Sequence, residues 1–260
     1  MTHANLLMEN EDTKKSAINM YSSGIFGRMR KILHENGLGF LIRKSFVFAW
    51  RYIYGLLFLR FRTECHFTFR NESYLYFYHP YNFTWDNERA VEIPIAMKSI
   101  AANKGKNVLE MGNVLSHYFP LEWDVLDKFD DGDGIICKDI VDYNPSEKYD
   151  LIVSISTLEH VGFDDDVKDP GKIVETMKNL KECCLKPDGS MIFTMPLGYN
   201  PFMDKMLFDG VLGFDDISFM KRISKTEWRE MSRNELGDYS YASEYIEAGA
   251  IVMGIYNGSK

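Results

Sequence analysis

Tyr149-Asp-Leu-Ile-Val-Ser-Ile155 is the strongest strand-like stretch of the 260-residue chain, and it decides the fold class. Its apolar, β-branched centre and its short length are typical of a strand buried on both faces. Similar short stretches lie at residues 107–111, 122–126, 134–137, 190–195 and 250–256. A helical pattern at residues 173–185 separates two of them. Strands that alternate with helices in this way predict a mostly parallel α/β sheet covered on both faces.

The remainder of the chain indicates three parts. Residues 1–22 are polar and lack a sustained period, so we expect a flexible tail. Residues 23–104 are expected to form a basic aromatic helix, a β-hairpin around the turn-forming Asn71, and a helix beginning near Glu88. Residues 105–260 hold the α/β domain.

The segment 26–62 combines basic and aromatic residues. Between Arg28 and Arg62, eight basic residues stand against one carboxylate, Glu35. On a helix, one side would carry basic residues and the opposite side apolar ones; these are Lys44, Arg51 and Arg62, opposite Phe46, Trp50, Ile53 and Leu57. The pattern predicts contact with an anionic membrane surface. A helix that covers the α/β domain, or that forms a dimer contact, is the alternative.

Composition limits the partners and the compartment. The net charge of −8 and the pI near 5.3 argue against a nucleic-acid partner. The four cysteines show no metal-binding or redox spacing, so we expect free thiols in a reducing cytoplasm and no metal. The N-terminus has no apolar signal-peptide core. The number of chains that assemble stays open.

Three residues follow consecutive predicted strands at the edge where such a sheet binds ligands. Gly112 follows the first strand, where a missing Cβ lets a ligand approach the backbone. Asp127 follows the second, where a carboxylate can accept ribose hydroxyls, and Asp139 follows the third, where an acid beside backbone amides can address an adenine edge. Each alone is an ordinary loop residue, but their order predicts a nucleoside site.

Three motifs within residues 106–196 carry a family resemblance. Val108-Leu-Glu-Met-Gly-Asn113 resembles the first motif of class I S-adenosylmethionine-dependent methyltransferases, and Tyr149 to Val161 is similar to their fourth-strand motif. Leu185-Lys-Pro-Asp-Gly-Ser-Met-Ile-Phe193 is similar to the turn that enters their fifth strand. The resemblance implies a Rossmann-like fold, with a mostly parallel seven-stranded sheet whose last strand is antiparallel. The subgroup suggested is bacterial or archaeal, with an unknown acceptor.

The resemblance also implies site residues, with residues 105–260 as the catalytic domain and S-adenosyl-L-methionine as cofactor. Glu110, Gly112 and Asn113 would meet the methionine part and Asp127 the ribose. Asp139 with Ile140 would frame the adenine, and Ser156, Thr157 and Leu158 would line the sulfonium side. One departure is clear: the family loop carries further glycines, whereas Asn113-Val-Leu-Ser116 follows Gly112.

Other residues are candidates for the acceptor side. His160 is the expected general base, with Glu159 to orient it, and the alternative is a histidine that only caps its loop. Tyr199, Asn200 and Asp204 are expected acceptor contacts, unless the loop merely packs Tyr199 and Phe202 onto the sheet. In the segment before the domain, Arg89 would suit the cofactor carboxylate, with Tyr81 and Asn82 beside it.

The function expected is methyl transfer to a small-molecule or lipid- or sugar-linked acceptor, by a cytoplasmic protein that contacts the inner membrane face. A non-catalytic binding or scaffold protein of the same fold is the alternative, favoured by the missing glycine. A nicotinamide-dependent reductase is a third reading, which the absence of a G-x-G-x-x-G stretch opposes.

Overall fold

The computed structural model describes residues 64–242 and 247–258, together with positions 38–39, 42–43, 45–47, 49–55 and 57. The chain divides into two units, residues 1–58 and 59–260. Every described position of the first unit is helical. In the described part of the chain, no helix combines the length and the apolar character needed to cross a bilayer. The predicted tail at residues 1–22, and Lys44 and Arg62 of the predicted basic face, lie outside the described residues.

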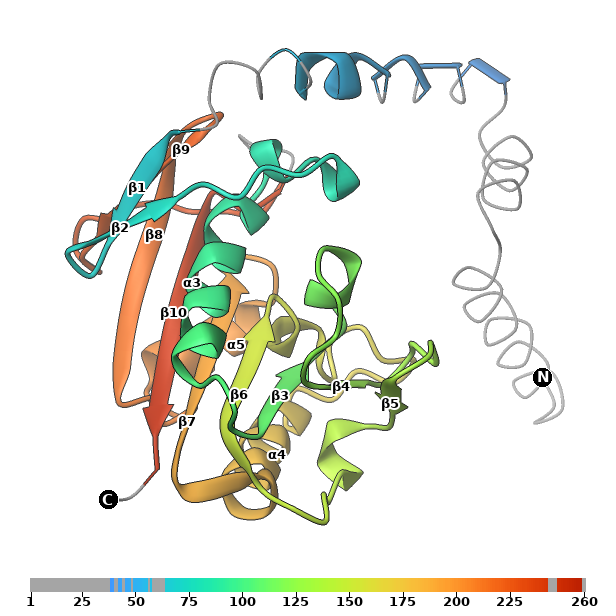
Figure 1. The fold of residues 1–260 in the computed structure, drawn as a ribbon. Helices are drawn as coiled ribbons and strands as arrows, with labels where there is room; N and C mark the ends of the chain where they lie inside the picture. The colour runs from blue at the N-terminus through green and yellow to red at the C-terminus, as the bar shows by residue number, and fades with distance from the viewer. Residues whose placement is uncertain are drawn as a thin grey trace, which may run out of the picture. The chain divides into compact units, whose positions relative to one another are not determined.

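The second unit is built on an eight-stranded sheet of order β5-β4-β3-β6-β7-β10-β8-β9 (Figure 1). Its strands are β3 (Val108–Met111), β4 (Asp124–Asp127), β5 (Ile135–Cys137), β6 (Tyr149–Ile155), β7 (Leu185–Pro196), β8 (Asp216–Ser224), β9 (Glu227–Met231) and β10 (Ala250–Asn257). The strands β5 to β7 pair in parallel, and β10 runs antiparallel to both of its neighbours. The expected mostly parallel α/β sheet with an antiparallel last strand is confirmed. It has one strand more than expected, because β8 turns back at Ser224 to pair with β9.

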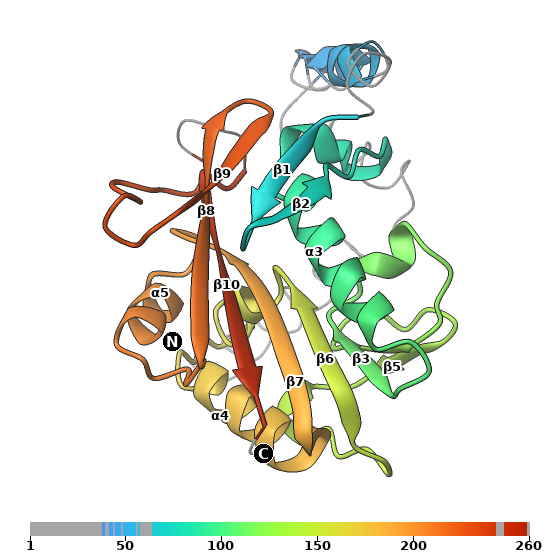
Figure 2. The ribbon, with the colours of Figure 1, turned by 60° about the vertical axis from the view of Figure 1, so that its left-hand side comes forward.

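Helices cover both faces of this sheet, as Figure 2 shows. On one face, α3 (Arg89–Ala102) packs Ile93 and Ala96 against Val153 of β6. The other face is covered by α4 (Lys172–Asn179) and α5 (Pro201–Phe208), whose apolar residues join a cluster that includes Ile152. Alternate residues of β6 therefore enter two different cores, which explains why the strand is apolar on both faces.

The expected hairpin consists of β1 (His66–Phe69) and β2 (Glu72–Leu75). The turn residues Arg70 and Asn71 both have positive φ, 51° and 61°, as a two-residue hairpin turn requires. Phe67 packs with Val91 of α3 and Trp228 of β9. The hairpin and α3 lie in the same compact unit as the sheet, residues 59–260, and the domain boundary expected at residue 105 stays a prediction.

Short helical turns complete the second unit. They are η1 (Tyr81–Asp86), η2 (Leu115–His117), η3 (Ile140–Asp142), η4 (Leu158–His160) and the π-helical turn η5 (Leu180–Cys184). Three of them, η2, η3 and η4, follow the parallel strands β3, β5 and β6. They lie at the carboxyl edge of the sheet, where the candidate ligand site is expected.

Candidate nucleoside site

The strand order changes direction between β3 and β6. From β3 the chain proceeds outward through β4 and β5, and it then returns to place β6 on the other side of β3. Loops that leave neighbouring strands in opposite directions open a crevice at their carboxyl ends. All predicted cofactor residues lie on the loops or strand ends around this switch point, between Glu110 and Leu158.

Glu110 organises the loop after β3. Its side chain is buried and accepts hydrogen bonds from the backbone N–H groups of Val114 (2.8 Å) and Leu115 (2.7 Å), and from Trp123 Nε1 (2.9 Å). Burial raises the pKa of Glu110, and these donors oppose the rise. The carboxyl group therefore fixes the loop conformation, and its predicted contact with the methionine part of a cofactor stays a prediction.

Gly112 and Thr157 bring the loops after β3 and β6 into contact. Gly112 has φ +88°, and a Cβ atom placed on it would lie 2.1 Å from Thr157 Oγ1. Thr157 Oγ1 also donates a hydrogen bond to the carbonyl oxygen of Ile155 (3.0 Å). The glycine is thus required here by a protein side chain. The Thr157 side chain therefore fills the space beside the backbone at Gly112.

Asp127 and Asn113 meet at the end of β4. Asp127 Oδ1 accepts from the N–H groups of Phe129 (2.8 Å) and Asp130 (2.9 Å), and Oδ2 accepts from the N–H of Asn113 (3.0 Å). A carboxylate has about four acceptor positions, so Oδ2 retains one for a hydroxyl group. The remaining acceptor position can take one hydroxyl group, and the expected contact of Asp127 with both ribose hydroxyls stays a prediction.

The predicted adenine side is occupied by an ion cluster. Lys172 Nζ lies 2.5 Å from Asp139 and 2.7 Å from Asp165, and Lys128 Nζ lies 3.1 Å and 2.7 Å from the same two carboxylates. Burial raises the pKa of Asp139, but the two lysines outweigh it and hold the pKa below its usual value. Ile140 is buried in the core. The cluster fastens the loop after β6 to the loops after β4 and β5.

The end of β6 carries backbone strain. Ser156 is a non-glycine residue with φ +40°, and its hydroxyl donates to Glu92 Oε1 (2.7 Å), which belongs to α3. Glu92 also pairs with Arg89 at 2.5 Å, so the guanidinium expected to meet a cofactor carboxylate already has a buried acidic partner. Leu158 is fully buried in the core, so its side chain does not line the crevice. Non-glycine residues with a positive φ, such as Ser156, gather at functional sites.

His160 and Glu159 differ in their surroundings. The His160 side chain is 45% exposed, and its Nδ1 lies 2.5 Å from Asp164 Oδ2. The Glu159 side chain is buried, neither of its oxygens has a hydrogen-bond partner in the described part of the chain, and Oε1 lies 3.6 Å from His160 Nε2. Burial raises the pKa of Glu159 well above its ordinary value. A buried carboxyl group with a raised pKa therefore lies beside an accessible imidazole.

The predicted acceptor residues take different positions. Tyr199 OH donates to Asp164 Oδ2 (2.6 Å), and its ring packs edge-on against His160. Asn200 is buried; its Oδ1 caps the N-terminus of α5 and its Nδ2 donates to the carbonyl oxygen of Glu159 (2.8 Å). Asp204 is buried and accepts from the N–H of Gly198 (2.8 Å). Only Tyr199 lies beside the histidine through its side chain, whereas Asn200 and Asp204 stabilise the loop.

Sequence reasoning missed Asp164, which contacts both His160 and Tyr199. It belongs to the run Asp164-Asp-Asp166, four residues after His160. That spacing was the available signal, because residues four apart can meet across one helical turn. Among the described residues, no group of three or more His, Cys, Asp or Glu side chains is placed to hold a metal ion.

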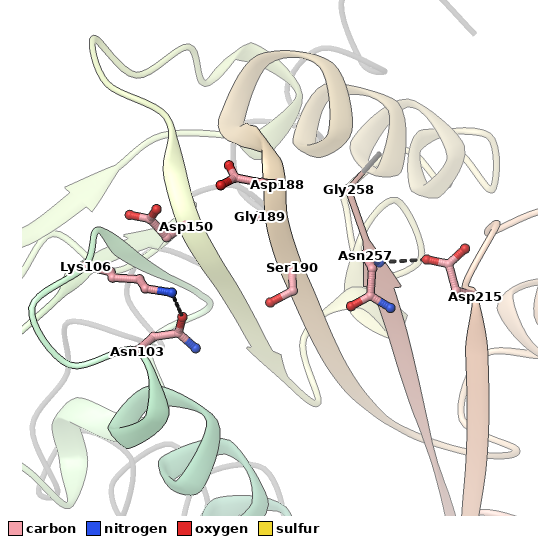
Figure 3. A pocket seen from close by; sticks show the side chains of 9 residues that line it. All are labelled: Asn103, Lys106, Asp150, Asp188, Gly189, Ser190, Asp215, Asn257 and Gly258. Atoms are coloured by element: carbon pink, nitrogen blue, oxygen red, sulfur yellow. Dashed lines mark hydrogen bonds between the residues drawn. The ribbon is translucent and has the colours of Figure 1, made fainter. Parts of the chain in front are cut away.

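A separate pocket of about 580 Å³ lies at the opposite edge of the sheet (Figure 3). It is lined by polar residues at or just before the starts of β3, β6 and β8, among them Lys106, Asp150 and Asp215. Lys106 donates to Asn103 Oδ1, and Asp215 accepts from the N–H of Asn257. These groups lie at the amino ends of the parallel strands, so the pocket is distinct from the nucleoside site.

Comparisons with known proteins leave the family open. No protein-family model and no curated protein matches the chain. Solved structures that resemble it include the N-methyltransferase NodS from Bradyrhizobium japonicum (15% identity, 66% of this chain and 97% of that chain, TM-score 0.40). A second is 1,6-didemethyltoxoflavin-N1-methyltransferase from Burkholderia thailandensis (11% identity, 76% and 100%, TM-score 0.39). A third is an S-adenosylmethionine-dependent methyltransferase from Clostridium acetobutylicum (15% identity, 63% and 89%, TM-score 0.34).

Proposed function

We propose that the chain is an S-adenosylmethionine-dependent methyltransferase of class I that acts on a small-molecule, lipid-linked or sugar-linked acceptor. The observation that carries the proposal is the position of Asp127 at the carboxyl end of β4, beside the switch point between β3 and β6. Its Oδ2 keeps an acceptor position open, and Asn113 is held next to it. A carboxylate in this place suits a ribose hydroxyl, as in other open α/β sheets that bind nucleosides.

Each part of the site has a role in this proposal. When bound, the cofactor supplies a methyl group on a positively charged sulfur, with a thioether as leaving group. Asp127 holds the ribose, and the ion cluster of Asp139, Lys172, Lys128 and Asp165 fixes the loops around the adenine. Ser156 and Thr157 line the sulfonium side, and alignment of the reacting groups in a closed crevice supplies much of the rate.

His160 is the proposed base for acceptors that must lose a proton. Its imidazole is accessible. Among the described residues, the carboxyl oxygen paired with Nε2 is Glu159 Oε1, at 3.6 Å, which is beyond the distance of a hydrogen bond. An imidazole exchanges protons near neutral pH, which suits a general base. Glu159 is buried beside that nitrogen, and burial raises the pKa of its carboxyl group, which disfavours a negative charge there.

Calorimetry with S-adenosylmethionine and S-adenosylhomocysteine tests the proposal. Saturable heat with both compounds, and a methyl group gained by a metabolite when the purified protein and cofactor are mixed with a cell extract, is the expected result. Binding without methyl transfer favours the non-catalytic scaffold, and the contact of Thr157 with Gly112 is the observation that favours this alternative. Heat only with NADH would instead support the reductase.

We also propose that the first unit brings the chain to the cytoplasmic face of an anionic membrane. Six exposed apolar side chains fall within an arc of about 120° on a helix of 3.6 residues per turn; they are Leu38, Ile42, Phe46, Trp50, Ile53 and Leu57, each between 52% and 70% exposed. Arg43 is exposed and borders this arc. An apolar face with basic residues at its edge is typical of helices that lie in a membrane interface.

A further inference from the structure

We propose that Asp164 is a positioning residue for His160: it holds the proton on Nδ1 and thereby makes Nε2 the basic nitrogen. This inference rests on the proposed base role of His160 and names the group that prepares it. The sequence patterns do not identify Asp164 as a site residue.

The contact geometry favours a donor at Nδ1. His160 Nδ1 lies 2.5 Å from Asp164 Oδ2, within hydrogen-bond distance. A carboxylate oxygen only accepts, so the imidazole nitrogen that faces it must carry the proton. A neutral imidazole holds one proton, and Nε2 is then left with a free electron pair.

Tyr199 fixes the orientation of the Asp164 carboxylate. Tyr199 OH donates to the same oxygen, Oδ2, at 2.6 Å, and the Tyr199 ring packs edge-on against the imidazole with centroids 4.7 Å apart. Tyr241 packs against the other side of Tyr199, with centroids 5.0 Å apart. The hydroxyl and the imidazole therefore converge on one carboxylate oxygen, and the aromatic packing restricts rotation of both rings.

The backbone around Asp164 is held on both sides. The N–H of Asp164 donates to the carbonyl oxygen of His160 (3.0 Å), which closes one helical turn between the two residues. The next residue, Asp165, is bound by Lys128 and Lys172. Asp164 thus cannot move far from His160 unless the ion cluster opens.

The Nε2 side of the ring offers no competing carboxylate. Glu159 Oε1 lies 3.6 Å from Nε2, beyond the distance of a hydrogen bond. Burial raises the pKa of the Glu159 carboxyl group, which disfavours a negative charge on the Nε2 side of the ring. Of the two carboxyl groups that flank the imidazole, only the exposed Asp164 is placed to accept a ring proton.

Imidazole nitrogen spectra of the full-length protein test this assignment. Two-bond proton–nitrogen correlations recorded at about pH 8, where ordinary imidazoles are neutral, report which nitrogen carries the proton, and His160→Gln identifies the signal. We expect the Nδ1–H tautomer in the wild type. We expect a shift toward Nε2–H in Asp164→Asn, because the amide can present its own N–H to Nδ1. Asp166→Asn, an exposed neighbour, is the matched control and leaves the tautomer unchanged.

Methyl transfer is the second readout. Turnover of Asp164→Asn is expected to fall by at least about tenfold with unchanged cofactor affinity, and Tyr199→Phe is expected to lie between this variant and the wild type. An unchanged tautomer in Asp164→Asn, or Nε2–H in the wild type, would overturn the assignment. A shifted tautomer in a protein without methyl transfer supports the positioning by Asp164 and contradicts only the proposed function.

Discussion

Thr157 Oγ1 occupies the space beside Gly112 in which any other residue would place its Cβ, since the two positions are only 2.1 Å apart. The loops after β3 and β6 therefore touch at the switch point of the sheet. This contact explains why position 112 holds a glycine, without reference to any ligand.

Gly112→Ala should lower the free energy of unfolding by about 2–3 kcal/mol, because it combines a strained positive φ with a forced contact. Urea unfolding measures the change. Gly105→Ala is the matched control, because Gly105 has a similar φ of +82° but nothing within 4 Å of an added Cβ. Adding Thr157→Ala should recover only part of the loss that exceeds the control, because the Cβ of residue 157 would still lie 2.8 Å from the added Cβ. Equal losses in Gly112→Ala and Gly105→Ala would contradict the importance of the contact.

Asp127→Asn should weaken binding of S-adenosylhomocysteine about tenfold, which corresponds to about 1.4 kcal/mol. The amide replaces one of the two oxygens that now accept three backbone hydrogen bonds, and with it the acceptor position for the ribose. Calorimetry gives the dissociation constant. Asp133→Asn, an exposed carboxylate nearby, should bind like the wild type, and equal affinity in both variants would remove Asp127 from the ribose site.

Lys172→Met should lower stability by about 1 kcal/mol at low salt, because it removes one of the two cations shared by Asp139 and Asp165. The difference from the wild type should shrink as sodium chloride is added, since salt screens partly exposed pairs. Denaturant unfolding at two salt concentrations tests this. Lys138→Met, at an exposed lysine next to Asp139, should show little change under both conditions. A loss independent of salt would indicate packing by the lysine stem instead.

The ion cluster also predicts a dependence on acid. The pKa of Asp139 and of Asp165 is lowered in the folded protein because the hydrogen bonds from Lys172 and Lys128 outweigh burial. A lowered folded pKa means that the stabilisation is present above the unfolded pKa and is lost as the pH falls through the folded value. The stability difference between wild type and Lys172→Met should therefore be larger at neutral pH than in strong acid, measured with the same denaturant.

Asp204 predicts the opposite pH dependence. Burial raises its pKa from 3.8 to about 6, and the N–H of Gly198 opposes the rise only in part. A raised folded pKa gives a contribution that is fully present below the unfolded pKa and is lost as the pH rises through about 6. The wild type should therefore lose stability relative to Asp204→Asn between about pH 4 and pH 7.5, measured by urea unfolding. Asp188→Asn, an exposed control, should keep a constant difference from the wild type across this range.

The membrane proposal predicts a result in vesicle flotation. The full chain should float with vesicles that contain anionic lipids, because the exposed apolar arc can enter the interface while basic residues meet the headgroups. Phe46→Asp with Trp50→Asp should abolish flotation. Phe129→Asp, at a residue that is 59% exposed in the second unit, should not. Flotation that survives the double substitution, or that neutral vesicles support equally well, would contradict this role.

Six strands of the sheet could be predicted from the sequence, although β7 begins at Leu185 and not at residue 190. β6 is found at Tyr149–Ile155 as expected, because a short apolar run between polar turns is typical of a buried strand. β8 and β9 were missed; Glu227–Met231 alternates weakly and becomes a strand mainly by pairing with β8. In the candidate site, Asp127 lies where it was expected at the strand end, whereas the side chains of Leu158 and Asn200 turned out to be buried in structural roles.

The sequence by itself determined the alternation of strands and helices, and with it the order in which Gly112, Asp127 and Asp139 reach one edge of the sheet. That information is local, because apolar period and turn residues act within a few positions. Only the tertiary structure decided which of these groups already have partners: Lys172 binds Asp139, 33 positions away, and Tyr199 meets Asp164, 35 positions away. Such contacts depend on how separate loops cross above the sheet, and no periodicity of the chain encodes that crossing.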